Sequence, residues 1–220
     1  MIMIQDEMGE RLLMNKFSVH EPDCLQIAGE SDQEPCYGCN QEWYETEWQR
    51  RAGCGPTVAA TLFYYLFRPD NRCYSKQEWL ERMEEVWNYV TPTERGMPTT
   101  QRFYRSVLDY AATKQQSIDY FCCDVPEERA DRPVLADLLQ FLTEGLQGDA
   151  AIAFLNLCNG EEQNLHRWHW VTIIAVEHAA DGSQALLKIL DEGKIKTVDL
   201  ALWLETTTLG GGFVYFQSQK

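Results

Sequence analysis

The feature that most constrains this chain is an apolar segment that follows residue 54. Residues 58–67 read VAATLFYYLF, so almost every position is apolar. Val58, Leu62, Tyr65 and Leu66 recur at helical spacing. A helix that is apolar on nearly every side has to be buried. The sequence therefore predicts one central helix, around which the rest of the chain packs.

The start of this helix carries a cysteine between two glycines. Pro56 suits the first helical turn, because its missing N–H would have no partner there. The unpaired N–H groups of a helix N-terminus favour the thiolate form of a cysteine, which is its nucleophilic form. Gly53 and Gly55 leave room for a substrate backbone. The pattern predicts that Cys54 is a nucleophile, and a packing cysteine is the alternative.

Further helices and strands follow from the spacing of apolar residues. A helix is expected after Ser75, because Glu78 completes a capping box with it. The predicted helices beyond the central one cover 76–90 and 100–112, and a last one begins at Asp131 or Pro133 and ends near Gly145. The predicted strands cover 150–157, 168–177, 185–190, 194–198 and 212–217. Helices followed by an antiparallel sheet indicate an α+β fold.

The first 45 residues have a different character. They contain many acids, with Pro22, Gly29 and Pro35 as breakers of regular structure. We expect an irregular N-terminal arm, residues 1–45, docked on a single domain that covers residues 46–220.

A histidine and an aspartate are placed to meet across a hairpin. His169 opens one predicted strand, Asp191 follows the next, and the turn signal AADGS separates them. Residue numbers that pair around a tight turn have a constant sum, here about 361 to 363 if the turn centres near Asp181. The numbers of His169 and Asp191 sum to 360. The two side chains are therefore predicted to lie opposite or one diagonal step apart, within reach of each other.

The other histidines are weaker candidates for a catalytic base. His166 falls in a segment that reads as a loop and would face the opposite side of a continuous strand. His20 lies in the predicted arm, and His178 lies at the turn. A cysteine nucleophile needs a base, and the base needs an orienting partner. The matching Asp191 is what favours His169.

Three short motifs resemble the papain-like superfamily of cysteine peptidases. They are GCGPTVAA around Cys54, HWV from His169 and LDEG around Asp191. The nearest branch by these motifs is the bacteriocin-processing, double-glycine-leader peptidase family. The resemblance runs in order over about residues 49–217. It implies a papain-like fold, in which the nucleophile opens a buried central helix and an antiparallel sheet follows.

The resemblance also implies an activity and the roles of four residues. Cys54 would attack a peptide carbonyl, His169 would move the proton, and Asp191 would hold the imidazole. Gln49 would complete an oxyanion hole with the backbone N–H of Cys54. The family glutamine usually stands six residues before the cysteine, whereas Gln49 stands five before it, and Gln41 is the substitute. The expected partner is a peptide or protein substrate, and no cofactor is expected.

Three alternatives share part of this pattern. The same thiol could pass an acyl group to an amine, as transglutaminase-like enzymes do, because the thioester step is common to both. The chain could also be a catalytically inactive peptide-binding module. A zinc site could use Cys36 and Cys39 with Cys24 or His20, although a second pair of ligands at a recognisable spacing is missing.

Charge and cysteine usage limit the partners and the compartment. The net charge of −15 makes nucleic acid and anionic membranes poor partners, because an acidic surface repels phosphate. No apolar run is long enough to span a membrane, and the N-terminus does not read as a secretory signal. We therefore expect the eight cysteines to be mostly free thiols in a cytoplasmic protein.

Overall fold

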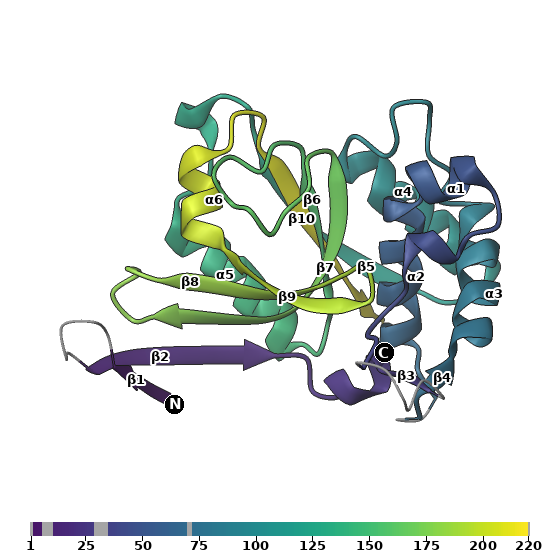
Figure 1. The fold of residues 1–220 in the computed structure, drawn as a ribbon, viewed down its shortest axis with the longest axis horizontal. Coiled ribbons are helices and arrows are strands. Elements are labelled where there is room, and N and C mark those ends of the chain that lie inside the picture. The colour runs from purple at the N-terminus through teal and green to yellow at the C-terminus, as the bar shows by residue number, and fades with distance from the viewer. Residues whose placement is uncertain (1, 6–10, 29–34, 70–71, 220) are drawn as a thin grey trace.

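An antiparallel sheet of eight strands forms the centre of the molecule in the computed structural model, which describes residues 2–5, 11–28, 35–69 and 72–219 (Figure 1). The strands are β1 (Ile2–Gln5), β2 (Arg11–Ser18), β5 (Ile118–Val125), β6 (Ile152–Asn156), β7 (His169–Ala179), β8 (Ala185–Asp191), β9 (Lys194–Asp199) and β10 (Gly211–Ser218). The main path runs β1-β2-β7-β6-β10-β5, and β8 and β9 extend from β7. Two short strands, β3 (Ile27–Ala28) and β4 (Tyr74–Ser75), pair separately in parallel.

Strand β7 is the hub of the sheet. Its first half pairs with β6, its second half pairs with β2, and β8 runs along the other edge. Most of its residues are buried, including Val171, Ile173 and Val176. A strand covered on both faces reads as a continuous apolar run, which explains why this segment does not alternate.

The helices lie on both sides of the sheet. In Figure 1, α1–α4 gather at the right of the sheet and α6 lies at its left, whereas α5 packs against β2 and β7. The helices are α1 (Glu47–Ala52), α2 (Cys54–Leu66), α3 (Lys76–Trp87), α4 (Thr100–Thr113), α5 (Leu135–Gln147) and α6 (Leu200–Thr206). Helix α2 packs against β7, β10 and β6, and α3 and α4 cover it from outside. In the described part of the chain, no helix is both long and apolar enough to cross a membrane.

The predicted central helix is confirmed. Helix α2 begins at Cys54 and buries Val58, Leu62 and Tyr65. The capping box before α3 is also present, because Ser75 accepts from the backbone of Glu78 and the Glu78 carboxylate accepts from Ser75. The α+β class follows from these helices and the antiparallel sheet.

Helix α5 begins later than predicted, at Leu135, and ends at Gln147, close to the predicted end near Gly145. Residues 129–131 form a separate short 3-10 helix, and the chain stays extended at Arg132 before α5 begins at Leu135. The helix also continues past Gly145, because Leu146 in its last turn is fully buried and this packing outweighs the low helix propensity of glycine.

The expectation of an irregular N-terminal arm is wrong for residues 2–5 and 11–18. They form β1 and β2, and β2 pairs with β7 from Met14↔Ala179 to Ser18↔Ala175. The sheet therefore includes β2, which precedes all the helices along the chain. It also includes β5, which lies between α4 and α5 along the chain. Strand β5 lies at the edge of the sheet and shows no alternating pattern, since the adjacent Tyr120 and Phe121 are both exposed. Gly29, one of the predicted breakers, lies outside the described residues.

Candidate active site

The thiol of Cys54 lies where the helical layer meets the sheet. Gly53 ends α1 and immediately caps α2, so Cys54 is the first residue of the buried helix. Cys54, His169 and Asp191 all line one narrow cavity of about 20 Å³. The structure thus brings together the three residues that the sequence singled out, from α2, β7 and β8.

The hairpin of β7 and β8 places the histidine beside the aspartate as the residue numbers predicted. The pair Thr172↔Leu190 lies next to the site, and a bulge after Ile173 shifts the register by one. His169 Nε2 lies 2.7 Å from Asp191 Oδ1. The other ring nitrogen, Nδ1, is then left to face the thiol. Asp191 is almost fully buried, which keeps its carboxylate out of water.

Burial and charge act in opposite directions on this histidine. Burial alone would lower the pKa of His169, because it penalises the imidazolium. The hydrogen bond to Asp191 and the hydrogen bond and charge of Cys54 outweigh burial and raise the pKa of His169 from its ordinary 6.5 to about 10. The imidazolium form is therefore favoured at neutral pH.

A lysine completes the surroundings of the aspartate. Lys196 Nζ, from β9, lies 2.7 Å from Asp191 Oδ2 and 3.1 Å from Glu192 Oε2. Burial would raise the pKa of Asp191, but its contacts with His169 and Lys196 hold that pKa below its ordinary 3.8. Lys196 is not among the residues predicted from the sequence. The hairpin of β8 and β9, in which Asp191 pairs with Lys194, was the available signal.

The predicted oxyanion role of Gln49 is wrong on geometry. Its amide nitrogen donates to Glu84 Oε2 at 2.7 Å, and its amide oxygen accepts from Thr46 in the capping box of α1. Gln49 is buried in this network and does not line the cavity with Cys54. The reason is local, because the third residue of a helix after a Thr cap is the position that turns back to the cap.

Gln41, the substitute, lines the cavity with Cys54 and His169. Its amide nitrogen donates to the carbonyl of Arg50 at 2.9 Å, which anchors the side chain and leaves a second N–H on the same nitrogen. The segment that carries it is fixed to the sheet, since Tyr37 N donates to Gly193 O at 2.8 Å. Part of the N-terminal region is therefore a wall of the site.

A second cavity of about 170 Å³ opens on the other side of Cys54. Trp48, Met97 and Trp170 line it, and Trp170 Nε1 donates to Met97 O at 2.7 Å. Trp168 also lines it, with a left-handed backbone (φ +56°) and 56% of its surface exposed. Exposed aromatic side chains beside a thiol can hold an apolar part of a substrate.

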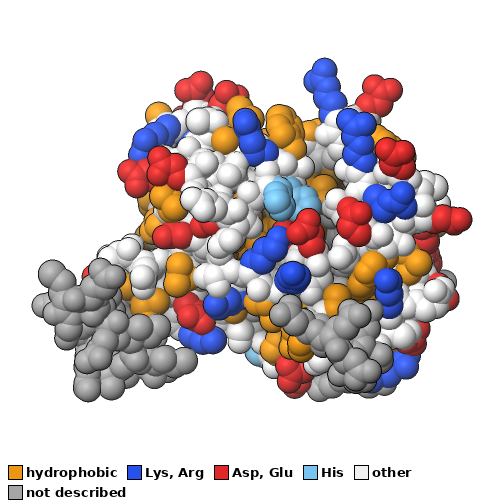
Figure 2. All heavy atoms as spheres, viewed as in Figure 1, with side chains coloured by type: hydrophobic (Ala, Val, Ile, Leu, Met, Phe, Trp, Pro, Cys, Tyr) orange, Lys and Arg blue, Asp and Glu red, His pale blue; other side chains and the backbone are white. Residues whose placement is uncertain are grey.

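His166 lies close to His169 but does not take part in the contact with Asp191. The ring of His166 lies edge-on to that of His169, with centroids 5.9 Å apart, and it is exposed. Figure 2 shows histidine side chains near the middle of this face, beside acidic and basic side chains. Among the described residues, only His166, Asp191 and Glu192 bring three metal-ligand atoms within 4.8 Å. Cys24, Cys36, Cys39 and His20 do not gather in this way, which contradicts the zinc alternative at these positions.

Comparisons with known proteins identify the fold. No protein-family model matches the chain, and no curated protein matches it. Among solved structures, UfSP from C. elegans, a papain-like cysteine protease, matches with a TM-score of 0.53 at 10% identity. The match covers 94% of this chain and 35% of UfSP, so the chain spans about a third of that protein. At this identity the likeness shows the fold, and the predicted papain-like α+β fold is confirmed. The resemblance to the bacteriocin-processing branch stays a prediction.

Proposed function

We propose that this protein is a cysteine peptidase that cleaves a peptide or amide bond through Cys54, His169 and Asp191. The observation that carries the proposal is the shared cavity, in which the Cys54 thiol meets an imidazole held 2.7 Å from a buried carboxylate. Nucleophile, base and orienting group in this arrangement are the parts that acyl transfer needs. The fold shared with UfSP supports the same class.

The first half of the reaction forms a thioester. The Cys54 thiolate attacks the carbonyl carbon of the substrate, and a C–S bond forms. The imidazolium of His169 then donates its proton to the leaving nitrogen as the C–N bond breaks. Asp191 keeps the ring oriented throughout, and Lys196 fixes the second oxygen of Asp191.

The second half releases the acid. His169, now neutral, takes a proton from water, and the resulting hydroxide attacks the thioester carbon. The C–S bond breaks, which regenerates the Cys54 thiolate, and the substrate leaves as a carboxylic acid. In both halves the backbone N–H of Cys54 and the remaining amide N–H of Gln41 would bind the oxyanion, a role supported by the place of both residues in the cavity lining.

Thiol alkylation tests the site without knowledge of the substrate. The protein is treated with iodoacetamide near pH 6, and each cysteine is followed by peptide mass mapping. We expect Cys54 to react roughly tenfold or more faster than Cys73, which is half-buried outside the cavity. His169→Ala should slow Cys54 to the rate of Cys73, whereas His178→Ala, on the same strand, should leave it unchanged.

Cys158 is the most stringent control for the alkylation rate of Cys54, because its own pKa is lowered. Burial opposes its ionisation, but hydrogen bonds from Thr208 and Gly160 and the charge of Arg167 lower the pKa of Cys158 to about 7. Only 7% of the residue is exposed, which limits access of the reagent. If Cys54 reacts no faster than Cys158 or Cys73, the site is not activated and the proposal fails.

Substrate turnover separates hydrolysis from acyl transfer. A mixture of internally quenched peptides, including one with a double-glycine leader sequence, is incubated with the protein and analysed by mass spectrometry. Hydrolysis gives free acids, whereas an acyl transferase gives adducts when a primary amine is added. Adducts as the main product would replace the peptidase assignment by the transferase. Binding without any product would assign a peptide-binding module.

A further inference from the structure

A third and larger cavity adjoins the cleft beside Cys54. It has a volume of about 800 Å³ and lies between the start of α4, the edge strand β5 and the ends of β6 and β10. Pro98, Leu155 and Leu157 line both this cavity and the cleft that contains Cys54. The two hollows therefore share a wall, and Cys54 lines the smaller of them.

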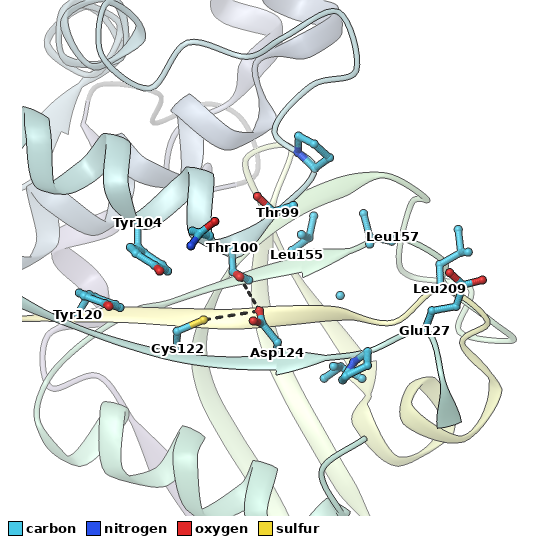
Figure 3. A pocket seen from close by; sticks show the side chains of 15 residues that line it. Thr99, Thr100, Tyr104, Tyr120, Cys122, Asp124, Glu127, Leu155, Leu157 and Leu209 are labelled. Carbon is cyan, nitrogen blue, oxygen red and sulfur yellow. Dashed lines mark hydrogen bonds between the residues drawn. The ribbon is translucent and has the colours of Figure 1, made fainter. Parts of the chain in front are cut away.

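The polar centre of the large cavity is a carboxylate held in place. Thr100 Oγ1 donates to Asp124 Oδ1 at 2.5 Å, and Cys122 Sγ lies 3.6 Å from the same oxygen (Figure 3). Thr100 is buried at the start of α4. Gly212, on β10, makes this contact possible, because a Cβ there would come within 2.6 Å of Thr100 Cγ2 and 3.0 Å of Asp124 Oδ1. The second oxygen, Oδ2, faces no ion-pair partner within the described residues.

A second carboxylate stands on the rim of the same cavity. Glu127 follows β5 in a loop that Arg132 fixes, since the Arg132 guanidinium donates to the carbonyls of Pro126 at 2.8 Å and Glu127 at 2.7 Å. Among the described residues that line the cavity, Asp124 and Glu127 are the charged ones, and none is basic. The cavity is thus negative, and hydrogen bonds hold the Asp124 carboxylate and the backbone of Glu127 in place.

Aromatic rings close the end of the cavity nearer to the start of β5. Tyr104 and Tyr120 stack with centroids 4.1 Å apart and an interplanar angle of 13°, and 43% of Tyr120 is exposed. Figure 3 shows this pair at one side of Asp124 and Glu127 at the other. A cationic side chain gains from an aromatic face as well as from a carboxylate. An acidic or a purely aliphatic side chain gains from one of these features at most.

We propose that this cavity is a specificity subsite, in which Asp124 and Glu127 bind an Arg or Lys side chain of the peptide that Cys54 attacks. The proposal rests on the function proposed above. The peptide lies extended over Pro98, Leu155 and Leu157, so the basic residue stands beyond the positions adjacent to the cleaved bond. Tyr104 and Tyr120 contact the aliphatic stem or the planar head of that residue.

The test uses internally quenched peptide mixtures in which one position at a time is fixed as Arg, Gln or Glu. We expect fixed Arg at one position away from the cleaved bond to raise kcat/KM about fivefold to tenfold over Gln, and Glu to lower it. Asp124→Asn keeps the acceptor for Thr100 and should remove most of that preference. Glu127→Gln, in an exposed loop, should remove about half of it, which covers the case in which the Asp124 variant folds poorly.

Asp119→Asn is the matched control, because it lies on the same strand outside the cavity. It should leave the Arg preference unchanged. Cleavage with equal rates for Arg, Gln and Glu at every position would overturn the subsite while the peptidase assignment stands. Absence of cleavage, combined with Arg-peptide binding to the Cys54→Ala protein that Asp124→Asn abolishes, would overturn the peptidase assignment while the subsite stands.

Discussion

The helical layer and the sheet contribute to the site in different ways. On the sheet, His169, Asp191 and Lys196 are fixed to one another by a strand register and by contacts of 2.7 Å. On the helical side, Cys54 lies in the first turn of α2, and its polar partner is His169, which belongs to the sheet. The sheet therefore holds a histidine that is already protonated at neutral pH, ready to donate its proton to the leaving nitrogen. The helix supplies a thiol whose reactivity depends on how closely the two layers approach.

We expect the loss of His169 to have the largest effect on activity of any single substitution in the site. His169→Ala leaves the Cys54 thiol without a proton acceptor, so we expect kcat/KM to fall on the order of 10⁵-fold. His178→Ala, at the other end of β7, should cost little activity. The measurement is turnover of the best peptide from the quenched mixture. Retention of activity within tenfold would mean that the sheet does not supply the base.

Neutralising the orienting carboxylate tests the sheet side alone. Asp191→Asn removes one of the two groups that raise the pKa of His169, so the ring should titrate below its value in the unchanged protein in an NMR experiment, and activity should fall about 10⁴-fold. Asp181→Asn, at the tip of the same hairpin, is the matched control.

The same pair should give a pH-dependent stability. Because the folded-state pKa of His169 lies above its unfolded value, its contribution is complete below pH 6.5 and is lost as the pH rises toward 10. The free energy of unfolding of Asp191→Asn should therefore change less over that range than that of the unchanged protein. Parallel curves for the two proteins would contradict the assigned ion pair.

Gln41 lines the cavity, whereas Gln49 stabilises the helix before Cys54, so substitutions of the two residues should have different effects. Gln41→Ala should lower kcat by about 10²-fold with little change in KM, because an oxyanion donor acts in the transition state. Gln49→Ala should lower stability more than the chemistry, since Gln49 caps α1 and binds Glu84. The reverse outcome, with a larger kcat effect for Gln49, would restore the assignment made from the sequence.

A single carboxylate joins the two layers away from the thiol. Asp149, just before β6, accepts from Tyr65 and Arg68 at 2.6 Å each, at the C-terminal end of α2, and from the backbone of His20 at 2.8 Å. Asp149→Ala should lower the free energy of unfolding by roughly 2 kcal/mol, because Arg68 loses its carboxylate partner and the Tyr65 hydroxyl loses its acceptor. Urea unfolding measures this, and the exposed Asp109→Ala serves as control.

The sequence predicted those parts of the molecule that depend on local pattern. Helix α2 follows from its apolar composition, α3 follows from its capping box, and the contact of His169 with Asp191 follows from a single turn. The N-terminal strand β2 could not be predicted in this way, because its partner β7 lies far along the chain and the pairing is long-range. The same holds for Gln41, whose place in the site depends on the backbone contact between Tyr37 and Gly193.

The separation of Cys54 from its base has a consequence for biosynthesis. The nucleophile leaves the ribosome more than a hundred residues before His169 and before the hairpin that carries Asp191 and Lys196. Because segments emerge in order and a long-range sheet closes only when its last strands are present, a nascent chain holds a thiol without its base. The thiol of Cys54 therefore gains its base only late in synthesis, once β7 and β8 have formed.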